Sequence, residues 1–203
     1  MHNGSNEKAL FEIADRQQGF FTTKQAIKCG FTSKNHNYYV KTGKWIREER
    51  GIYRLVNYPL GKRTDLMRWY LWSRNRKDIP QGVYSHATAL MLYDLSDIMP
   101  EKLHMTVPKY FRRNQSIPKI LKIYKQDLPD SDIKFYYGVK ITTPIRTIID
   151  VIEENIISKD LIRQAISEAL RKGLIISKKK LLEHPYLKKC SLIKKIIEED
   201  ILC

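Results

Sequence analysis

The sequence predicts an α+β protein with a small amino-terminal domain of helices and a hairpin, followed by a mixed α/β domain that ends in helices. Three observations support this fold class. Residues 5–42 show helical periodicity broken by turn residues, residues 45–55 favour a hairpin, and residues 103–142 contain short runs of strand-forming residues. A break with Pro59 and Gly61 lies between the two parts, so we expect domains at 1–58 and 64–203.

Three helices are predicted in the first domain, over residues 6–17, 23–29 and 32–42. Thr22 and Thr32 are suitable caps for the second and third helices, because their hydroxyl groups can accept from free backbone N–H groups. Gly30 and Gly43 suit the left-handed position that follows a helix end. The short connection between the second and third helices is typical of a helix-turn-helix.

Two runs of strand-forming residues, 45–47 and 52–55, flank a turn that contains Gly51. The order helix, helix, turn, helix, hairpin is that of a winged helix-turn-helix. In that fold the third helix enters the major groove of DNA, and the hairpin reaches the backbone or the minor groove.

The second domain begins with predicted helices over 64–74 and 84–93. Strands are expected over 103–107, 120–124 and 135–142, since apolar and polar residues alternate in the first of them. Thr143 can cap a helix that has Pro144 at its first position. Further helices are predicted over 158–172, from Ser177 onward, and over about 191–202.

The third helix of the first domain is expected to carry the chemistry. Its residues His36, Tyr39 and Val40 share one face, which we assign to the core, with His36 as a buried histidine. The opposite face contains no acidic residue, and lysine and asparagine side chains can contact phosphates and base edges. In the hairpin, arginines are offset by Glu48 and Glu49. The candidate DNA-binding residues are Thr22, Thr23, Ser33, Lys34, Asn35, Asn37, Tyr38, Lys41, Arg47 and Arg50.

The charge balance agrees with a polyanionic partner. Lys and Arg number 37 against 22 Asp and Glu, which gives a formal net charge of +15. A folded body with this charge attracts phosphate polyanions or an anionic membrane face, although a lysine-rich composition that merely aids solubility is the alternative. The three scattered cysteines and the lack of a long apolar segment favour a reduced cytoplasmic location without a membrane span.

Catalysis is not expected, and neither is a cofactor or a metal ion. Glu101-Lys102 lacks the spacer of a nuclease acid-x-Lys motif, and Ser85-His86 is not surrounded by the glycines of a nucleophile elbow. Asp150 follows Arg146 at i, i+4, a spacing that more often forms a structural ion pair.

Several stretches together resemble the AbiEi antitoxins, over about residues 7–183. They are FFTTKQA at 20–26, GFTS at 30–33, GKWIR at 43–47, RGIYRL at 50–55, SHATAL at 85–90, LSD at 95–97, HMTVP at 104–108 and ITTPIRTIID at 141–150. The resemblance implies a type IV toxin–antitoxin (abortive infection, phage defence) system. Its antitoxin represses its own promoter, expected to hold inverted repeats, and counteracts a nucleotidyltransferase toxin without a stable complex.

Two points stay open at this stage. Lys109, Arg112 and Arg113 form a basic cluster that could extend a DNA footprint, bind RNA, bear on the toxin, or be a solvated loop. The alternative function is a winged-helix protein that directs a second nucleic-acid-processing activity, such as a nuclease, to its target.

Overall fold

The computed structural model describes residues 3–61, 63–177 and 183, and the chain divides into two compact units. The first unit is residues 1–82 with 136–139, and the second is residues 83–135 with 140–203. The first unit continues past the predicted linker at 59–61, because helix α4 (Thr64–Trp72) packs against the strands that precede it. The separation into functional domains at 1–58 and 64–203 stays a prediction.

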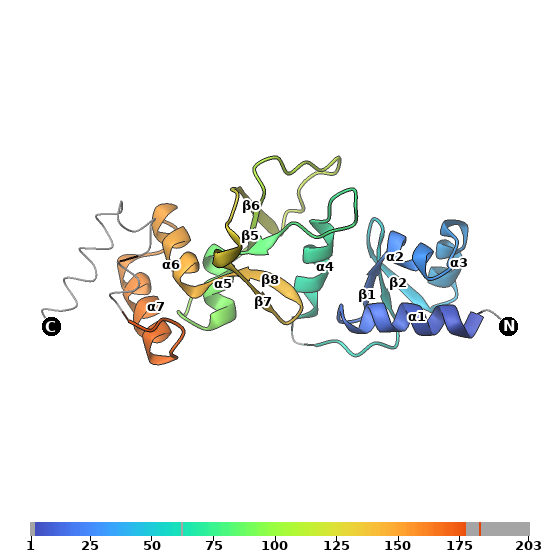
Figure 1. Ribbon diagram of the computed structural model, residues 1–203, viewed down its shortest axis with the longest axis horizontal. Helices are drawn as coiled ribbons and strands as arrows, with labels where there is room; N and C mark the ends of the chain where they lie inside the picture. The colour runs from blue at the N-terminus through green and yellow to red at the C-terminus, as the bar shows by residue number, and fades with distance from the viewer. Residues whose placement is uncertain (1–2, 62, 178–182, 184–203) are drawn as a thin grey trace, which may run out of the picture. The chain divides into compact units, whose positions relative to one another are not determined.

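Helices and a small antiparallel sheet make up the first unit (Figure 1). The sheet has the order β1-β3-β2, with Phe21 opposite Tyr53 and a bulge in β2 between Arg47 and Glu49. The elements before α4 are α1 (Asn3–Asp15), β1 (Phe20–Thr22), α2 (Thr23–Lys28), η1 (Ser33–Asn35), α3 (His36–Lys41), β2 (Trp45–Glu49) and β3 (Ile52–Leu55).

The predicted elements of this unit are largely confirmed. Gly30 and Gly43 adopt φ angles of +89° and +72°, as their positions after helix ends require. The predicted third helix is shorter than expected, because residues 33–35 form a 3₁₀ turn before α3 begins at His36. Thr32 does not cap it through its side chain. The turn is instead closed by a backbone hydrogen bond of 3.0 Å from Asn35 N–H to the Thr32 carbonyl.

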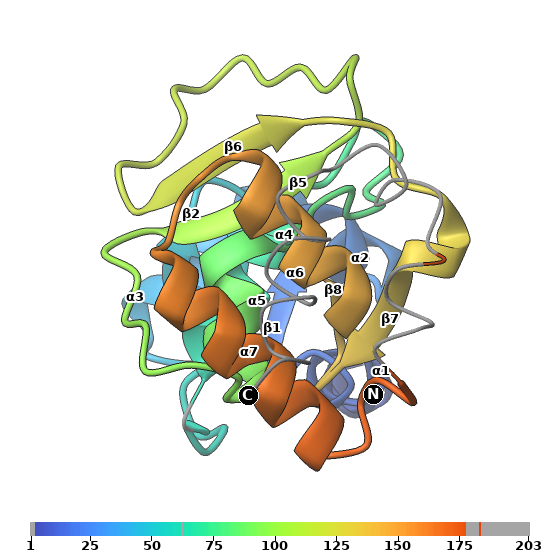
Figure 2. The same cartoon turned by 90° about the vertical axis from the view of Figure 1, so that its left-hand side faces the viewer.

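The second unit is built around a five-stranded sheet of order β6-β5-β4-β8-β7. Strand β4 is antiparallel to β5 and parallel to β8, and β5 is parallel to β6. Helices α5, α6 and α7 lie on one face of this sheet (Figure 2). The elements are β4 (Val83–Tyr84), α5 (His86–Tyr93), β5 (Leu103–Val107), β6 (Leu121–Lys125), η2 (Asp130–Asp132), β7 (Ile133–Tyr136), β8 (Val139–Thr142), α6 (Pro144–Glu153) and α7 (Lys159–Arg171).

Two predictions for this unit need correction. The single strand expected over 135–142 is two strands, because Tyr137 and Gly138 take φ angles of +47° and +84° and turn the chain. The helix expected to start at residue 84 starts at His86, since Val83 and Tyr84 pair within the sheet.

The helix boundaries further along agree better with the sequence. Helix α6 begins as predicted, with Thr143 as its cap and Pro144 in its first turn. The helices expected after Ser177 and over 191–202 lie outside the described residues. Within the described ranges, every helix is too short or too polar to cross a bilayer.

Candidate nucleic-acid interface

Local sequence signals fix the start of α2. The Thr22 hydroxyl accepts a hydrogen bond of 3.2 Å from Gln25 N–H, and the Gln25 side chain accepts one of 2.8 Å from Thr22 N–H. This reciprocal capping box satisfies two backbone donors at the helix start. The left-handed Gly30 then turns the chain toward Phe31, which is buried in the core of the unit. The two helices of the motif are thereby joined by a short, defined turn.

The inward face of α3 is aromatic and fixes how the helix is rotated. His36 is buried, and its ring lies 5.3 Å from that of Trp45 and 5.5 Å from that of Tyr53. Tyr39 stacks on Trp45 with ring centroids 4.7 Å apart. Burial lowers the pKa of His36, so the ring is neutral near pH 7 and packs as part of the core. The assignment of His36 as a core histidine is confirmed.

The outward face of η1 and α3 carries most of the predicted contact residues. All of the contact residues on this face are exposed, and Tyr38 is 62% exposed. No acidic residue occurs between residues 32 and 45, so this face is free of charges that would repel phosphate. The structure thus brings together Ser33, Lys34, Asn35, Asn37, Tyr38 and Lys41.

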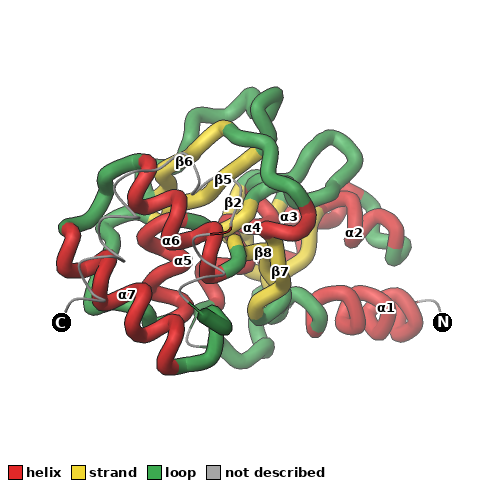
Figure 3. The backbone as a smooth tube through the Cα atoms, turned by 60° about the vertical axis from the view of Figure 1, so that its left-hand side comes forward, coloured by secondary structure: helices red, strands yellow, loops and turns green. Residues whose placement is uncertain are grey.

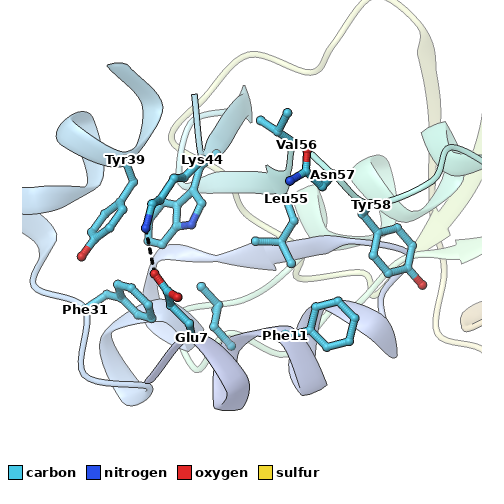
Figure 4. A pocket seen from close by; sticks show the side chains of 11 residues that line it. Glu7, Phe11, Phe31, Tyr39, Lys44, Leu55, Val56, Asn57 and Tyr58 are labelled. Carbon is cyan, nitrogen blue, oxygen red and sulfur yellow. Dashed lines mark hydrogen bonds and ion pairs between the residues drawn. The ribbon is translucent and has the colours of Figure 1, made fainter. Parts of the chain in front are cut away.

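A pocket of about 330 Å³ lies behind this face, between α1, α3 and the sheet (Figure 4). Tyr39 and Phe31 lie on one side of it, and Phe11 and Tyr58 lie on the other. At one end, the Lys44 ammonium pairs with the Glu7 carboxylate at 2.9 Å. Tyr39 therefore belongs to the inner wall of the unit, while its neighbour Tyr38 faces outward.

The hairpin presents Arg47 and Arg50 to solvent, and its turn is Arg50-Gly51. Glu48 is held inside the unit, since its carboxylate pairs with Arg54 at 2.8 Å and with Arg68 at 3.4 Å. Two cations thus offset one of the two hairpin glutamates. The exposed arginines consequently face less opposing charge than the sequence alone suggested.

The base of the hairpin turn is fastened to the segment after α4. The Gly51 carbonyl accepts hydrogen bonds of 3.1 Å from Thr23 N–H and from Arg74 Nη2. Arg74 in turn pairs with Asp78 at 3.0 Å. Sequence reasoning missed both residues, although their i, i+4 spacing was visible.

Two predicted contact residues lie apart from the exposed face. Thr22 is 1% exposed, and its hydroxyl serves the capping box and donates a hydrogen bond to Asp78. Thr23 is half-buried beneath the hairpin turn. Their positions support a structural contribution of both threonines to the arrangement of α2 and the hairpin.

The polar residues considered for catalysis lie in the second unit. His86 and His104 are buried beside Tyr124, and Arg146 and Asp150 form a buried ion pair at 2.6 Å. Among the described residues, no three His, Cys, Asp or Glu side chains are grouped closely enough to hold a metal ion. Two further acidic residues of this unit make surface interactions: Asp94 pairs with Lys172, and Asp97 accepts a hydrogen bond from Gln164.

The basic cluster after β5 lies in the long connection between β5 and β6 (Figure 3). Lys109 and Arg112 are exposed there, and Arg113 is half-buried with a hydrogen bond of 3.3 Å to Gln115. Exposed basic side chains on a loop fit each of the interpretations left open by the sequence.

Comparison with known proteins supports the regulator interpretation of the first unit. Residues 8–56 match the family of transcriptional regulators described as AbiEi antitoxin. No curated protein matches the chain. The crystal structure of the RV2827C protein from Mycobacterium tuberculosis is similar with a TM-score of 0.54 and 10% identity, covering 89% of this chain and 72% of that chain. At that identity the likeness concerns the fold. The predicted resemblance to the AbiEi antitoxins is confirmed for residues 8–56.

Proposed function

We propose that the chain is a cytoplasmic antitoxin that binds double-stranded DNA through a winged helix-turn-helix and represses its own toxin–antitoxin operon. The observation that carries the proposal is the acid-free outward face of η1 and α3, which lies within the segment that matches the AbiEi regulators. The net charge of +15 favours a polyanionic partner in addition.

Each exposed side chain of this face has a plausible contact. Lys34 and Lys41 are suited to phosphates or guanine edges, and Asn37 to the paired donor and acceptor of adenine. Ser33 and Asn35 can donate to phosphate oxygens. In this proposal α3 enters the major groove and the hairpin lies along the backbone or in the minor groove.

The hairpin arginines serve a different purpose in this proposal. Arg47 and Arg50 are exposed, and Arg50 lies at the turn, where it can reach a phosphate or the minor groove. Support comes from the withdrawal of Glu48 into its pairs with Arg54 and Arg68, because it leaves the turn with a more positive surface.

DNA binding is tested by fluorescence anisotropy with the promoter region of the chain's own operon. A Lys34→Ala, Asn37→Ala, Lys41→Ala variant should lose most of its affinity. The slope of log affinity against log salt should fall by about 2, because each lost phosphate contact releases one fewer counterion. Lys8→Ala with Lys159→Ala is the matched control, since it also removes two exposed positive charges but outside this face. Equal affinity of the triple variant and the control would reject the interface.

The proposed second function is to counteract a nucleotidyltransferase toxin through residues 64–203, without a stable complex between the two proteins. It is supported by the family match of the first unit and by the separate compact second unit. Co-expression with the toxin from an unrelated promoter tests it. The triple variant should lose repression yet still restore growth. Failure to restore growth, with normal expression, would mean that DNA binding takes part in neutralisation.

A further inference from the structure

A second pocket, of about 460 Å³, lies in the second unit where the start of α5, the end of β6 and α6 come together. It is lined mainly by polar side chains, and six of them matter here: His86, Tyr124, Gln126, Asp150, Glu153 and Glu154. The pocket belongs entirely to one unit and is separate from the candidate DNA interface.

Asp150 is the unusual member of this lining. It is 2% exposed, and its Oδ1 accepts a hydrogen bond of 2.6 Å from Arg146 Nε. Its second oxygen, Oδ2, is buried and has no hydrogen-bond partner within the described part of the chain. Buried carboxylate oxygens nearly always have a donor, and an open one is costly. Asp150 lines the pocket, so a ligand that reaches this buried oxygen with a donor would satisfy it.

The side of the wall formed by His86 and Tyr124 is held by hydrogen bonds and ring stacking. His86 Nδ1 lies 2.8 Å from the Ser85 hydroxyl, which accepts in turn from Thr106 at 2.8 Å. The His86 ring stacks on Tyr124 with centroids 3.7 Å apart. His86 also holds a φ of +51°, a conformation that residues other than glycine rarely adopt and that clusters at functional sites.

The two histidines do not oppose a positive ligand. Burial is the main cause that lowers the pKa of His86 to about 3 and that of His104 to about 4. Both rings are therefore neutral near pH 7. The hydroxyl of Tyr124 shares a hydrogen bond of 3.0 Å with His104 Nδ1, so these two groups already have a partner within the protein.

The charge around the pocket is negative, in a chain whose net charge is +15. Arg146 pairs with Asp150 and donates a hydrogen bond of 2.9 Å to the side-chain oxygen Oε1 of Gln126. The charged groups that surround Asp150, line the pocket or act on its lining side chains are three bases, Lys122, Lys125 and Arg146, and four acids, Asp132, Asp150, Glu153 and Glu154. Four acids against three bases leave a formal charge of −1 when all are ionised.

We propose that this pocket binds a cationic nitrogen group, an ammonium or a guanidinium, that donates to Asp150 Oδ2 while Glu153 and Glu154 attract it at the mouth. Such a group can come from a free amine, for example a polyamine, or from a basic side chain of a protein partner. Both sources share the chemistry that the pocket recognises. The inference does not depend on DNA binding by the first unit.

Isothermal titration of the full chain tests the proposal. The probes are agmatine and spermidine for free amines, and an acetylated, amidated Gly-Arg-Gly peptide for a side chain. Urea, a neutral planar donor, should not bind. Tighter binding of the amines assigns the pocket to a free ligand, and tighter binding of the peptide assigns it to a protein side chain. Absence of binding by all three cations at millimolar concentration would overturn the proposal.

Three variants locate the site. Asp150→Asn should weaken binding about tenfold or more, because it removes a charged hydrogen bond. Glu153→Gln with Glu154→Gln should weaken it about threefold to fivefold, since these carboxylates are exposed to solvent. Glu101→Gln, an exposed acid away from the pocket, is the control and should bind like wild type. If Asp150→Asn does not fold, the double variant decides. Wild-type affinity in either folded variant would overturn the assignment.

The pH profile supplies an independent measurement. Burial raises the pKa of Asp150 to about 7, opposed by Arg146 and reinforced by Glu153 and Asp132. A cation prefers the ionised carboxylate, so its affinity should rise about tenfold from pH 6 to pH 8 and a proton should be released on binding. The neutral histidines do not titrate in this range. A flat profile would contradict a role of Asp150 as the acceptor.

Discussion

Acidification from pH 7 to pH 5 is predicted to destabilise the second unit through its two buried histidines. His86 and His104 have pKa values of about 3 and about 4 in the folded chain, against 6.5 in an unfolded one. Between these limits the unfolded chain binds more protons, so stability falls as the pH falls. Near pH 5 the histidines are almost all protonated in the unfolded chain and almost all neutral in the folded chain. This difference lowers the free energy of unfolding by about 2 kcal/mol for each histidine.

Asp150 acts in the opposite direction over the same range. Its pKa is raised to about 7 in the folded chain, against 3.8 unfolded, so the folded chain binds more protons between these limits. Protonation of the folded carboxyl therefore restores about 2 kcal/mol between pH 7 and pH 5. The free energy of unfolding of the wild type should therefore fall by about 2 kcal/mol from pH 7 to pH 5. In Asp150→Asn, which lacks the stabilising protonation of the carboxyl, it should fall by about 4 kcal/mol over the same interval.

The assay must report on the second unit, and all three tryptophans belong to the first. Hydrogen exchange of the α5 and α6 amides, corrected for the intrinsic effect of pH, gives the required opening free energies. A double His86→Gln, His104→Gln variant is the control, and its stability should not fall on acidification. If the wild type loses more stability than Asp150→Asn between pH 7 and pH 5, the assignment of the opposing contributions is wrong.

Three further predictions concern the hairpin. Arg50→Glu should lower affinity for DNA of any sequence to a similar extent, because we expect an exposed arginine at the turn to contact the backbone rather than a single base edge. A loss confined to the operator would argue otherwise. Gly51→Val should distort the turn, since Gly51 has a φ of +72° and a Cβ there would lie 2.9 Å from Arg74 Nη2; unchanged melting and affinity would contradict this. Arg74→Ala should lower the free energy of unfolding of the first unit by about 1–3 kcal/mol in urea denaturation, because the Gly51 carbonyl loses one of its two donors and Asp78 loses its charged partner. Equal unfolding midpoints of variant and wild type would refute it.

The local features of the fold could be predicted from the sequence because they depend on neighbouring residues. His36, Tyr39 and Val40 recur at helical spacing, and this periodicity alone predicted which side of α3 is buried. The Thr143-Pro144 start of α6 has the same origin, since both the capping hydroxyl and the ring are local determinants.

The features that sequence reasoning missed depend on distant partners or on very short elements. Strand β4 has only two residues, too few to show a strand pattern in the sequence. It is held in the extended conformation by pairing with Met105 of β5 and Ile141 of β8. Gly138 marked a turn within the predicted strand over 135–142, but the apolar residues on both sides favoured continuity. The open oxygen of Asp150 was also hidden, because i, i+4 spacing predicts the bond to Arg146 and says nothing about the second oxygen.

The arrangement of charges explains how a hairpin with two glutamates can still present exposed positive side chains at the proposed DNA interface. Taken along the chain, Glu48 and Glu49 cancel Arg47 and Arg50. In the folded unit, Glu48 is turned inward to two arginines, Arg54 from β3 and Arg68 from α4, while Arg47 and Arg50 stay exposed. Because α4 supplies one of these cations, the charge of the hairpin depends on residues beyond the segment that matches the AbiEi regulators. A fragment that ends before α4 should therefore bind DNA more weakly than the full chain, even with the α3 face unchanged.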